Sequence, residues 1–261
     1  MAGDWVLPGW AIPAMAAVVG GAFGSFLNVC VYRLPKGESV LWPPSTCPSC
    51  GRRIAWYDNV PVLGWLVLRG RCRQCRAPIA IQYPLIEALI AALWGAAFWW
   101  YGPTWQALSA SLFGTILVGI TLTDARHYII PDEFTWGGLV LGLLLSLAGG
   151  LPSVGRAVLG AAVGFGLLYG VAWAGEKVFR KEAMGGGDIK MMAMVGAFVG
   201  WQGVLLTIFG GALLGTVIFV PISLRTKKLV PFGVFLAAGA AVTFVAGDAI
   251  VDWYRRTMLG W

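Results

Sequence analysis

The chain has 261 residues, of which 58% are hydrophobic and 12% are charged, and its mean hydropathy is +0.76. A soluble domain carries about 25% charged residues, so the composition excludes a soluble globular protein and indicates a helical membrane protein with several spans. The apolar runs are too long and continuous for the strands of a membrane β-barrel.

Apolar run length predicts about eight transmembrane segments. A removable signal peptide is not predicted at the start, because the first run is long and no basic region precedes it. The sixth segment is short, and a helix there spans only about 20 Å of the roughly 30 Å hydrocarbon core. The eight segments are 10–32, 84–101, 105–124, 134–150, 154–175, 188–200, 202–224 and 231–251.

The loop at 33–83 carries two CxxC pairs, Cys47 with Cys50 and Cys72 with Cys75. This spacing is typical of a four-thiolate zinc ribbon. A loop with few aliphatic residues needs such a metal to fold. Two disulfides are the alternative interpretation, which a reducing compartment disfavours. The sequence therefore predicts a small zinc-ribbon-like domain with a structural metal ion.

Lysine and arginine are distributed unevenly between the two sides of the predicted membrane. The side of the cysteine loop holds 16 of the 19 basic residues, and the other side holds Arg156, Arg255 and Arg256. The positive-inside rule places the cysteine loop in the cytoplasm and both termini outside. Topology and anionic lipid account for the net charge of +7, so nucleic-acid binding is not predicted.

Two aspartates lie at the ends of membrane-length segments. Asp124 closes an apolar run, and Asp188 follows Gly185, Gly186 and Gly187 and opens another. A carboxylate at membrane depth is costly and indicates function by default. Two on the same side predict a catalytic pair, with the three glycines as a supporting loop that lets backbone approach the substrate. The alternative is that each aspartate reaches to water or caps a helix.

Motifs in chain order resemble those of the type IV prepilin peptidases, which serve pilus, type II secretion and competence systems. The resemblance covers nearly the whole chain and includes a GxGD stretch shared with presenilin-like intramembrane proteases. Besides the two cysteine pairs, the stretches are Gly24–Val29 (GSFLNV), Tyr32–Pro35 (YRLP), Trp56–Leu63 (WYDNVPVL), Arg69–Cys72 (RGRC), Tyr83–Glu87 (YPLIE), Asp124 with Pro131–Thr135 (PDEFT), Met184–Asp188 (MGGGD) and Pro231–Gly233 (PFG).

The resemblance implies a multi-pass enzyme of the bacterial cytoplasmic membrane. It would cut the short basic leader from prepilins or pseudopilins at the cytoplasmic face and N-methylate the new terminus from S-adenosylmethionine. The implied organisation is a first transmembrane helix at 1–32, a zinc-binding, methyltransferase-associated domain at 33–83, and an aspartic peptidase domain at 84–261. Anionic lipid attracts the basic leader, so enzyme and substrate are expected to meet within the membrane.

The methyl-donor site is not assigned to residues by the sequence. The chain lacks the Gly-rich strand-turn-helix of nucleotide-binding folds, so the site must be unconventional. Glu87 lies one turn inside the second segment, where a carboxylate usually has a partner or a task.

The rival interpretation is a small proton- or cation-coupled transporter with a regulatory zinc module. Transporters often show duplicated helix sets with charged residues near the midplane. Here no repeat is visible and both aspartates lie at one face, so the peptidase interpretation is favoured.

Overall fold

The structure is a computed structural model that describes residues 8–181, 184–226 and 231–259, with side chains over 8–181, 184–218 and 231–258. Helices dominate it, and among these residues β-structure is limited to two isolated bridges. The predicted all-α fold class is confirmed. The chain divides into two compact units, Met1–Thr115 and Ile116–Trp261, with the boundary inside helix α4 (Trp105–His127).

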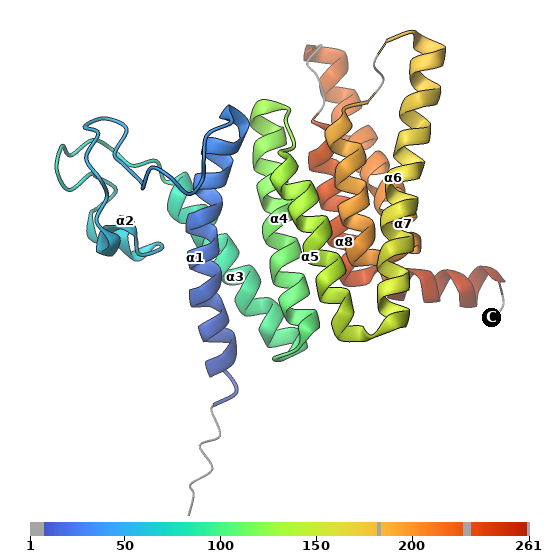
Figure 1. Cartoon of the computed structure of the whole chain (residues 1–261), viewed down its shortest axis with the longest axis horizontal. Coiled ribbons are helices and arrows are strands. Elements are labelled where there is room, and N and C mark those ends of the chain that lie inside the picture. Colours follow the sequence, from blue (N-terminus) through green and yellow to red (C-terminus); the bar gives the residue numbers. More distant parts are fainter. Residues whose placement is uncertain (1–7, 182–183, 227–230, 260–261) are drawn as a thin grey trace, which may run out of the picture. The chain divides into compact units, whose positions relative to one another are not determined.

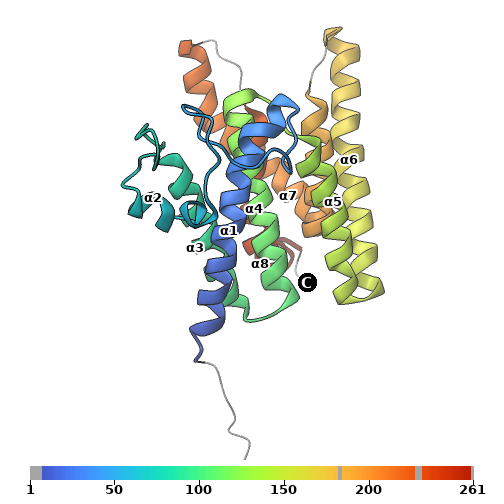
Figure 2. The ribbon, with the colours of Figure 1, turned by 60° about the vertical axis from the view of Figure 1, so that its left-hand side comes forward.

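In the first unit, α1 (Ala11–Arg33) and α3 (Gln82–Tyr101) pack side by side (Figure 1, Figure 2). Their close approach depends on two glycines spaced four residues apart on α1. A Cβ on Gly20 would lie 2.7 Å from Trp94, and one on Gly24 would lie 2.8 Å from the Cα of Glu87. Small residues at this spacing let membrane helices approach closely, since lipid supplies no hydrophobic drive for their association.

The connection between α1 and α3 holds only short helical pieces. These are the 3₁₀ turns η1 (Leu34–Lys36) and η2 (Trp56–Asn59) and the single-turn α2 (Leu63–Val67). The two β-bridges, Thr46 with Arg53 and Arg71 with Pro78, each enclose one CxxC pair. Hydrophobic packing is sparse here, which is the property expected of a metal-stabilised loop.

The second unit comprises the rest of α4 and the helices that follow. They are α5 (Asp132–Ser146), the 3₁₀ turn η3 (Leu147–Gly149), α6 (Leu151–Phe179), α7 (Gly186–Thr226), α8 (Phe232–Tyr254) and the terminal π-helical turn η4 (Arg255–Leu259). Figure 1 and Figure 2 show α5, α6 and α7 side by side.

The first half of α7 is the core of this unit. The side chains of Met191, Met192, Met194 and Val195 are fully buried. On α6, Gly160 packs directly against the backbone of Gly196, and on α5, Gly138 and Gly142 receive Met194 and Phe198. A helix surrounded by protein need not match the bilayer thickness, which explains why the segment predicted at 188–200 is so short.

The predicted segments correspond to helices, but their number depends on how α7 is counted. Gly200 has φ 72° and ψ 176°, so α7 consists of two helices joined by a break at the predicted boundary between 188–200 and 202–224. Among the described residues, six helices are long and apolar enough to span a membrane. The prediction of about eight includes both halves of α7 and the 15-residue α5.

Candidate active site and metal centre

Asp124 lies near the C-terminal end of α4, and its carboxylate is held by the start of α8. The residue is 6% exposed. The backbone N–H of Val234 donates to Asp124 Oδ2 at 3.2 Å, and the backbone of Gly233 also bonds the carboxylate. The N–H of Val234 also reaches the carbonyl of Pro231, the N-cap of α8, at 3.3 Å, so Asp124 adds an acceptor from another element at this helix terminus.

Asp188 lies half-buried in the first turn of α7, directly after the glycine stretch. Its backbone N–H bonds the carbonyl of Gly185 at 3.2 Å. The Asp188 carboxylate lies close enough to Asp124 for the two charges to interact. The structure therefore brings together the two carboxylates that the sequence separates by 64 positions.

Ile130, in the connection between α4 and α5, explains how the two aspartate segments meet. A Cβ on Gly187 would lie 3.0 Å from Ile130 Cβ, and one on Gly233 would lie 2.8 Å from Ile130 Cδ1. One side chain thus touches both the glycine stretch before Asp188 and the start of α8 that binds Asp124. Gly185 and Gly186 make no such close contact, so packing requires glycine only at Gly187 within the predicted supporting loop.

Gly233 is a site residue to which sequence reasoning gave no role, although the PFG stretch was part of the family resemblance. A Cβ at this position would lie 2.9 Å from Asp124 Oδ2 and 2.8 Å from Ile130. The position therefore requires glycine because a carboxylate occupies the space.

We expect Gly233→Ala to reduce peptidase turnover by about 10- to 100-fold, because the added methyl group displaces Asp124 from its backbone donors. Gly137→Ala on α5 is the matched control, since a Cβ there meets nothing within 4 Å. The measurement is turnover of purified protein at matched thermal stability. Wild-type turnover in Gly233→Ala would show that the Val234 contact does not position Asp124.

Asp132 and Lys190 form an ion pair beside the aspartate pair. Lys190 Nζ lies 2.7 Å from Asp132 Oδ1 and 2.9 Å from Oδ2. Asp132 lies in the first turn of α5, where its negative charge complements the helix dipole. The structure adds that it binds the cation two residues after Asp188, linking α5 to the start of α7.

The four cysteines of the loop converge on one point. Their sulfur atoms all lie within 4.8 Å of one another, and Cys47 Sγ is 3.8 Å from Cys75 Sγ. Sulfurs bound tetrahedrally to zinc at about 2.3 Å are about 3.8 Å apart. All four thiols are free, so the two-disulfide alternative is not adopted. The cluster has the composition and size of a four-thiolate metal site.

The two CxxC pairs form equivalent backbone turns. The N–H of Gly51 bonds the carbonyl of Cys47 at 2.8 Å, and that of Arg76 bonds the carbonyl of Cys72 at 3.0 Å. Gly51 and Arg76 both have left-handed backbone conformations, with φ of 70° and 61°. Glycine adopts this conformation freely, whereas arginine adopts it at a cost of roughly 1–2 kcal/mol. The fold imposes the same geometry on both pairs despite that cost.

Hydrogen bonds within the cluster favour thiolate at Cys47. The backbone N–H groups of Cys50 and Ser49 donate to this sulfur and lower the pKa of the Cys47 thiol from 9.0 to about 6. At Cys75 the backbone N–H of Ala77 acts in the same direction, but burial and the other three thiols outweigh it and raise the pKa to about 11. Without a cation, therefore, the four sulfurs do not all ionise together.

A bidentate ion pair ties the second turn to the rest of the loop. Arg73 donates to both carboxylate oxygens of Asp58, at 2.6 to 3.1 Å. Its hydrogen bonds and charge hold the pKa of the Asp58 carboxyl below the usual 3.8. Asp58 thus anchors the cysteine turn to η2, and this contact gives the Asp of the WYDN stretch a structural role.

Glu87 lies buried where α3 faces α1 and the start of α2. It is 9% exposed, and its Oε2 accepts the backbone N–H of Val62 at 2.7 Å. Val62 has a φ of 61°, which is rare for a β-branched residue. The partner that the sequence led us to expect for this carboxylate is therefore the backbone N–H of Val62, a loop residue in a strained conformation.

Comparison with known proteins agrees with this geometry. Residues 18–101 match the bacterial peptidase A24 N-terminal domain, and residues 111–220 match the type IV leader peptidase family. No solved structure matches the chain. The second match contains both aspartates.

Curated relatives extend the similarity to most of the chain. A prepilin leader peptidase/N-methyltransferase of Aeromonas hydrophila is 38% identical over 90% of this chain and 91% of its own length. Proteins of the same name from Myxococcus xanthus and Pseudomonas aeruginosa are 38% and 36% identical, over 86% and 92% of this chain and 68% and 92% of their own lengths. On these matches, the chain belongs to the type IV leader peptidase family.

Proposed function

We propose that this chain cleaves the leader from type IV prepilins and related proteins, and N-methylates the new terminus. The observation that carries the first activity is the convergence of Asp124 and Asp188 at one face of the second unit. Family membership and the names of the relatives support both activities. Family likeness supports the reaction, and the carboxylate pair supports Asp124 and Asp188 as the residues that perform it.

The proposed hydrolysis uses the two carboxylates as an acid and a base. Two carboxylates this close do not ionise together easily, so the pair shares one proton. The ionised member takes a proton from the water that attacks the scissile carbonyl. The protonated member hydrogen-bonds the carbonyl oxygen and then protonates the leaving amine. The bonds from Val234 and Gly233 fix Asp124 for this role.

We further propose that Cys47, Cys50, Cys72 and Cys75 hold one structural zinc ion. The free thiols, their mutual distances of no more than 4.8 Å and the donors to Cys47 fit such an ion. Four sulfurs fill the tetrahedral shell and leave no position for a reacting water. The metal would therefore stabilise the loop and take no part in peptide hydrolysis.

S-adenosylmethionine is the proposed methyl donor, since the relatives carry the N-methyltransferase name. The proposed location is the bacterial cytoplasmic membrane, with the active site at the cytoplasmic face. The six apolar helices found in the described part of the chain support membrane insertion, and the uneven placement of lysine and arginine supports the orientation. The substrate would reach the site laterally through the membrane.

The transporter alternative is not supported. Both aspartates lie at helix ends, Asp124 within the last turn of α4 and Asp188 in the first turn of α7. The relatives named above are peptidases.

Incubation of the purified chain with a purified prepilin in detergent tests the proposed cleavage. We expect the mass of the product to fall by the mass of the leader, and an intact substrate would contradict the proposal.

The orientation gives a separate prediction. A cysteine introduced at Ser45 should be labelled by a permeant reagent only, while one introduced at Thr104, in the connection on the opposite side, should also react with an impermeant reagent. The unsubstituted chain supplies the background for its five cysteines. Reporter fusions at 176–183 and 225–228 should also be cytoplasmic, although 182–183 and 227–228 lie outside the described residues. Labelling of the Ser45 position from outside would invert the topology.

A further inference from the structure

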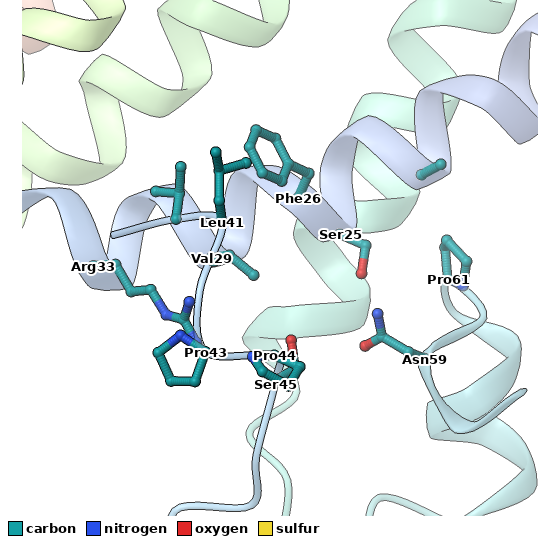
Figure 3. A pocket seen from close by; sticks show the side chains of 12 residues that line it. Ser25, Phe26, Val29, Arg33, Leu41, Pro43, Pro44, Ser45, Asn59 and Pro61 are labelled. Carbon is teal, nitrogen blue, oxygen red and sulfur yellow. The ribbon is translucent and has the colours of Figure 1, made fainter. Parts of the chain in front are cut away.

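A pocket with a volume of about 290 Å³ lies between α1 and the cysteine loop, within the first unit (Figure 3). One wall is the C-terminal part of α1, and the others come from residues 40–45 and from the end of η2. Ligand pockets of proteins begin near this size, at roughly 300 Å³. Neither the carboxylate pair nor the four sulfurs line it, so the pocket belongs to neither the proposed peptidase site nor the metal site.

Polar and apolar groups both line the pocket, and besides Arg33 the polar side chains are Ser25, Asn59 and Ser45. Figure 3 shows the Ser25 hydroxyl and the Asn59 amide facing one another, with Phe26, Val29 and Leu41 along the walls. Arg33 also lines the pocket, but it is eight residues from Ser25 on the same helix, or about 12 Å. Its guanidinium donates to the carbonyl of Ser39 at 3.0 Å. The pair of Ser25 and Asn59, the polar end of the pocket, therefore lies away from the positive charge.

A buried carboxyl group, that of Glu87, lies behind this polar end. The Ser25 side chain interacts with the carboxylate of Glu87, which also accepts the N–H of Val62, the residue after Pro61 of the pocket wall. The only ion pairs among the described residues join Arg73 to Asp58 and Lys190 to Asp132, so Glu87 has no cation. Nearby, Asn28 donates to the carbonyl of Tyr83, but its buried Oδ1 lacks a donor in the same part of the chain. Behind the pocket, buried hydrogen-bond acceptors therefore outnumber the hydrogen-bond donors that reach them.

An unpaired buried carboxylate is costly and favours a cationic ligand in its vicinity. The new terminus of a cleaved prepilin has this chemistry, because it carries an α-ammonium group on the first residue of an apolar helix. The ammonium matches the polar end at Ser25 and Asn59, and the apolar side chain matches the walls.

We propose that this pocket is the methyl-acceptor site, in which Ser25 and Asn59 bind the N-terminal amine of the cleaved prepilin and Glu87 acts through Ser25. This inference rests on the methyl-transfer half of the proposed function. Glu87 is a positioning residue, because it reaches the amine only through the Ser25 hydroxyl.

Methyl transfer begins with the loss of a proton from the ammonium group. The ammonium gives one proton to Ser25 Oγ while the Ser25 hydroxyl proton passes to Glu87. The freed lone pair on nitrogen then attacks the methyl carbon of the sulfonium donor. A new N–C bond forms, the C–S bond breaks, and its electron pair stays on sulfur as a neutral thioether.

The test supplies leaderless prepilin and tritium-labelled S-adenosylmethionine to the purified full chain, so that methylation does not depend on prior cleavage. Ser25→Ala and Glu87→Gln should lower methyl incorporation at least tenfold and leave leader cleavage within twofold of wild type. Ser109→Ala and Glu176→Gln are the matched controls, since both residues lie outside the pocket and the two assigned sites. Asn59→Ala should raise the KM for leaderless prepilin without changing the KM for the methyl donor.

The pH profile separates the proposed role of Glu87 from a merely structural one. The deficit of Glu87→Gln should shrink as pH rises above the ordinary pKa of an α-amine, near 8, because a deprotonated amine needs no proton acceptor. Glu87→Asp retains the charge and should recover part of the rate. If Glu87→Gln is unstable, Ser25→Ala and Asn59→Ala decide the question.

Wild-type methylation in both Ser25→Ala and Asn59→Ala would overturn the inference. So would equal loss of cleavage and methylation, or a change confined to the KM for the methyl donor. A wild-type chain that cleaves but incorporates no methyl group would instead remove the methyl-transfer half of the proposed function, on which the inference depends.

Discussion

Replacement of either Asp124 or Asp188 by asparagine should abolish leader cleavage. Each change removes the acid or the base from a pair that shares one proton. When catalytic residues act as a unit, loss of one member removes most of the rate enhancement of the whole unit. We expect turnover to fall by on the order of 10³-fold or more in each variant. The double variant should be no worse than either single variant within the limits of the assay. The measurement is conversion of purified prepilin in detergent.

Asparagine is nearly isosteric with aspartate and can still accept the backbone bonds that reach Asp124, so expression and thermal stability should change little. Asp252→Asn is the matched control, because Asp252 is exposed and lies near the opposite end of α8 from Gly233. Residual cleavage above a few per cent in Asp124→Asn or Asp188→Asn would remove that residue from the catalytic pair.

Replacement of either cysteine pair by serine should release the metal. The wild-type chain should contain about one zinc per molecule, and Cys47→Ser with Cys50→Ser, or Cys72→Ser with Cys75→Ser, should contain almost none. Structural zinc contributes about 10–16 kcal/mol to the folding of small zinc modules, so its loss should unfold the loop. Metal analysis of the purified protein and limited proteolysis of the loop measure the two effects.

Such variants should lose methyl transfer or substrate handling more than peptide hydrolysis. Asp124 is held by Val234, and the glycines beside the two aspartates, Gly187 and Gly233, pack on Ile130; all of these contacts lie within the second unit and none involves the loop. Cys30→Ala is the control, because Cys30 lies in α1 outside the cluster and its loss should leave the zinc content unchanged. A zinc-free, correctly inserted protein without peptidase turnover would show that the two modules are not separable.

The sequence by itself determined the helical membrane class, and the structure confirms it. The bilayer makes this possible, since it demands apolar runs of a fixed length with internal backbone hydrogen bonds, and such runs are visible in one dimension. The family was likewise readable from short ordered stretches, and the comparisons confirm it. The roles of Asp124, Asp188 and the four cysteines stay predictions, which the geometry supports.

Tertiary structure alone decided which distant residues share a site. Val234 and Asp124 are 110 positions apart, and no periodicity in the chain links them. The sequence indicated no role for Ile130, yet its side chain lies in contact with both Gly187 and Gly233. The burial of residues 191–197 inside the second unit, and the pocket beside Ser25, also depend on how helices pack. Lipid gives helices no hydrophobic reason to choose one neighbour over another, so the choice depends on close fits between particular glycines and backbones, which hydropathy does not encode.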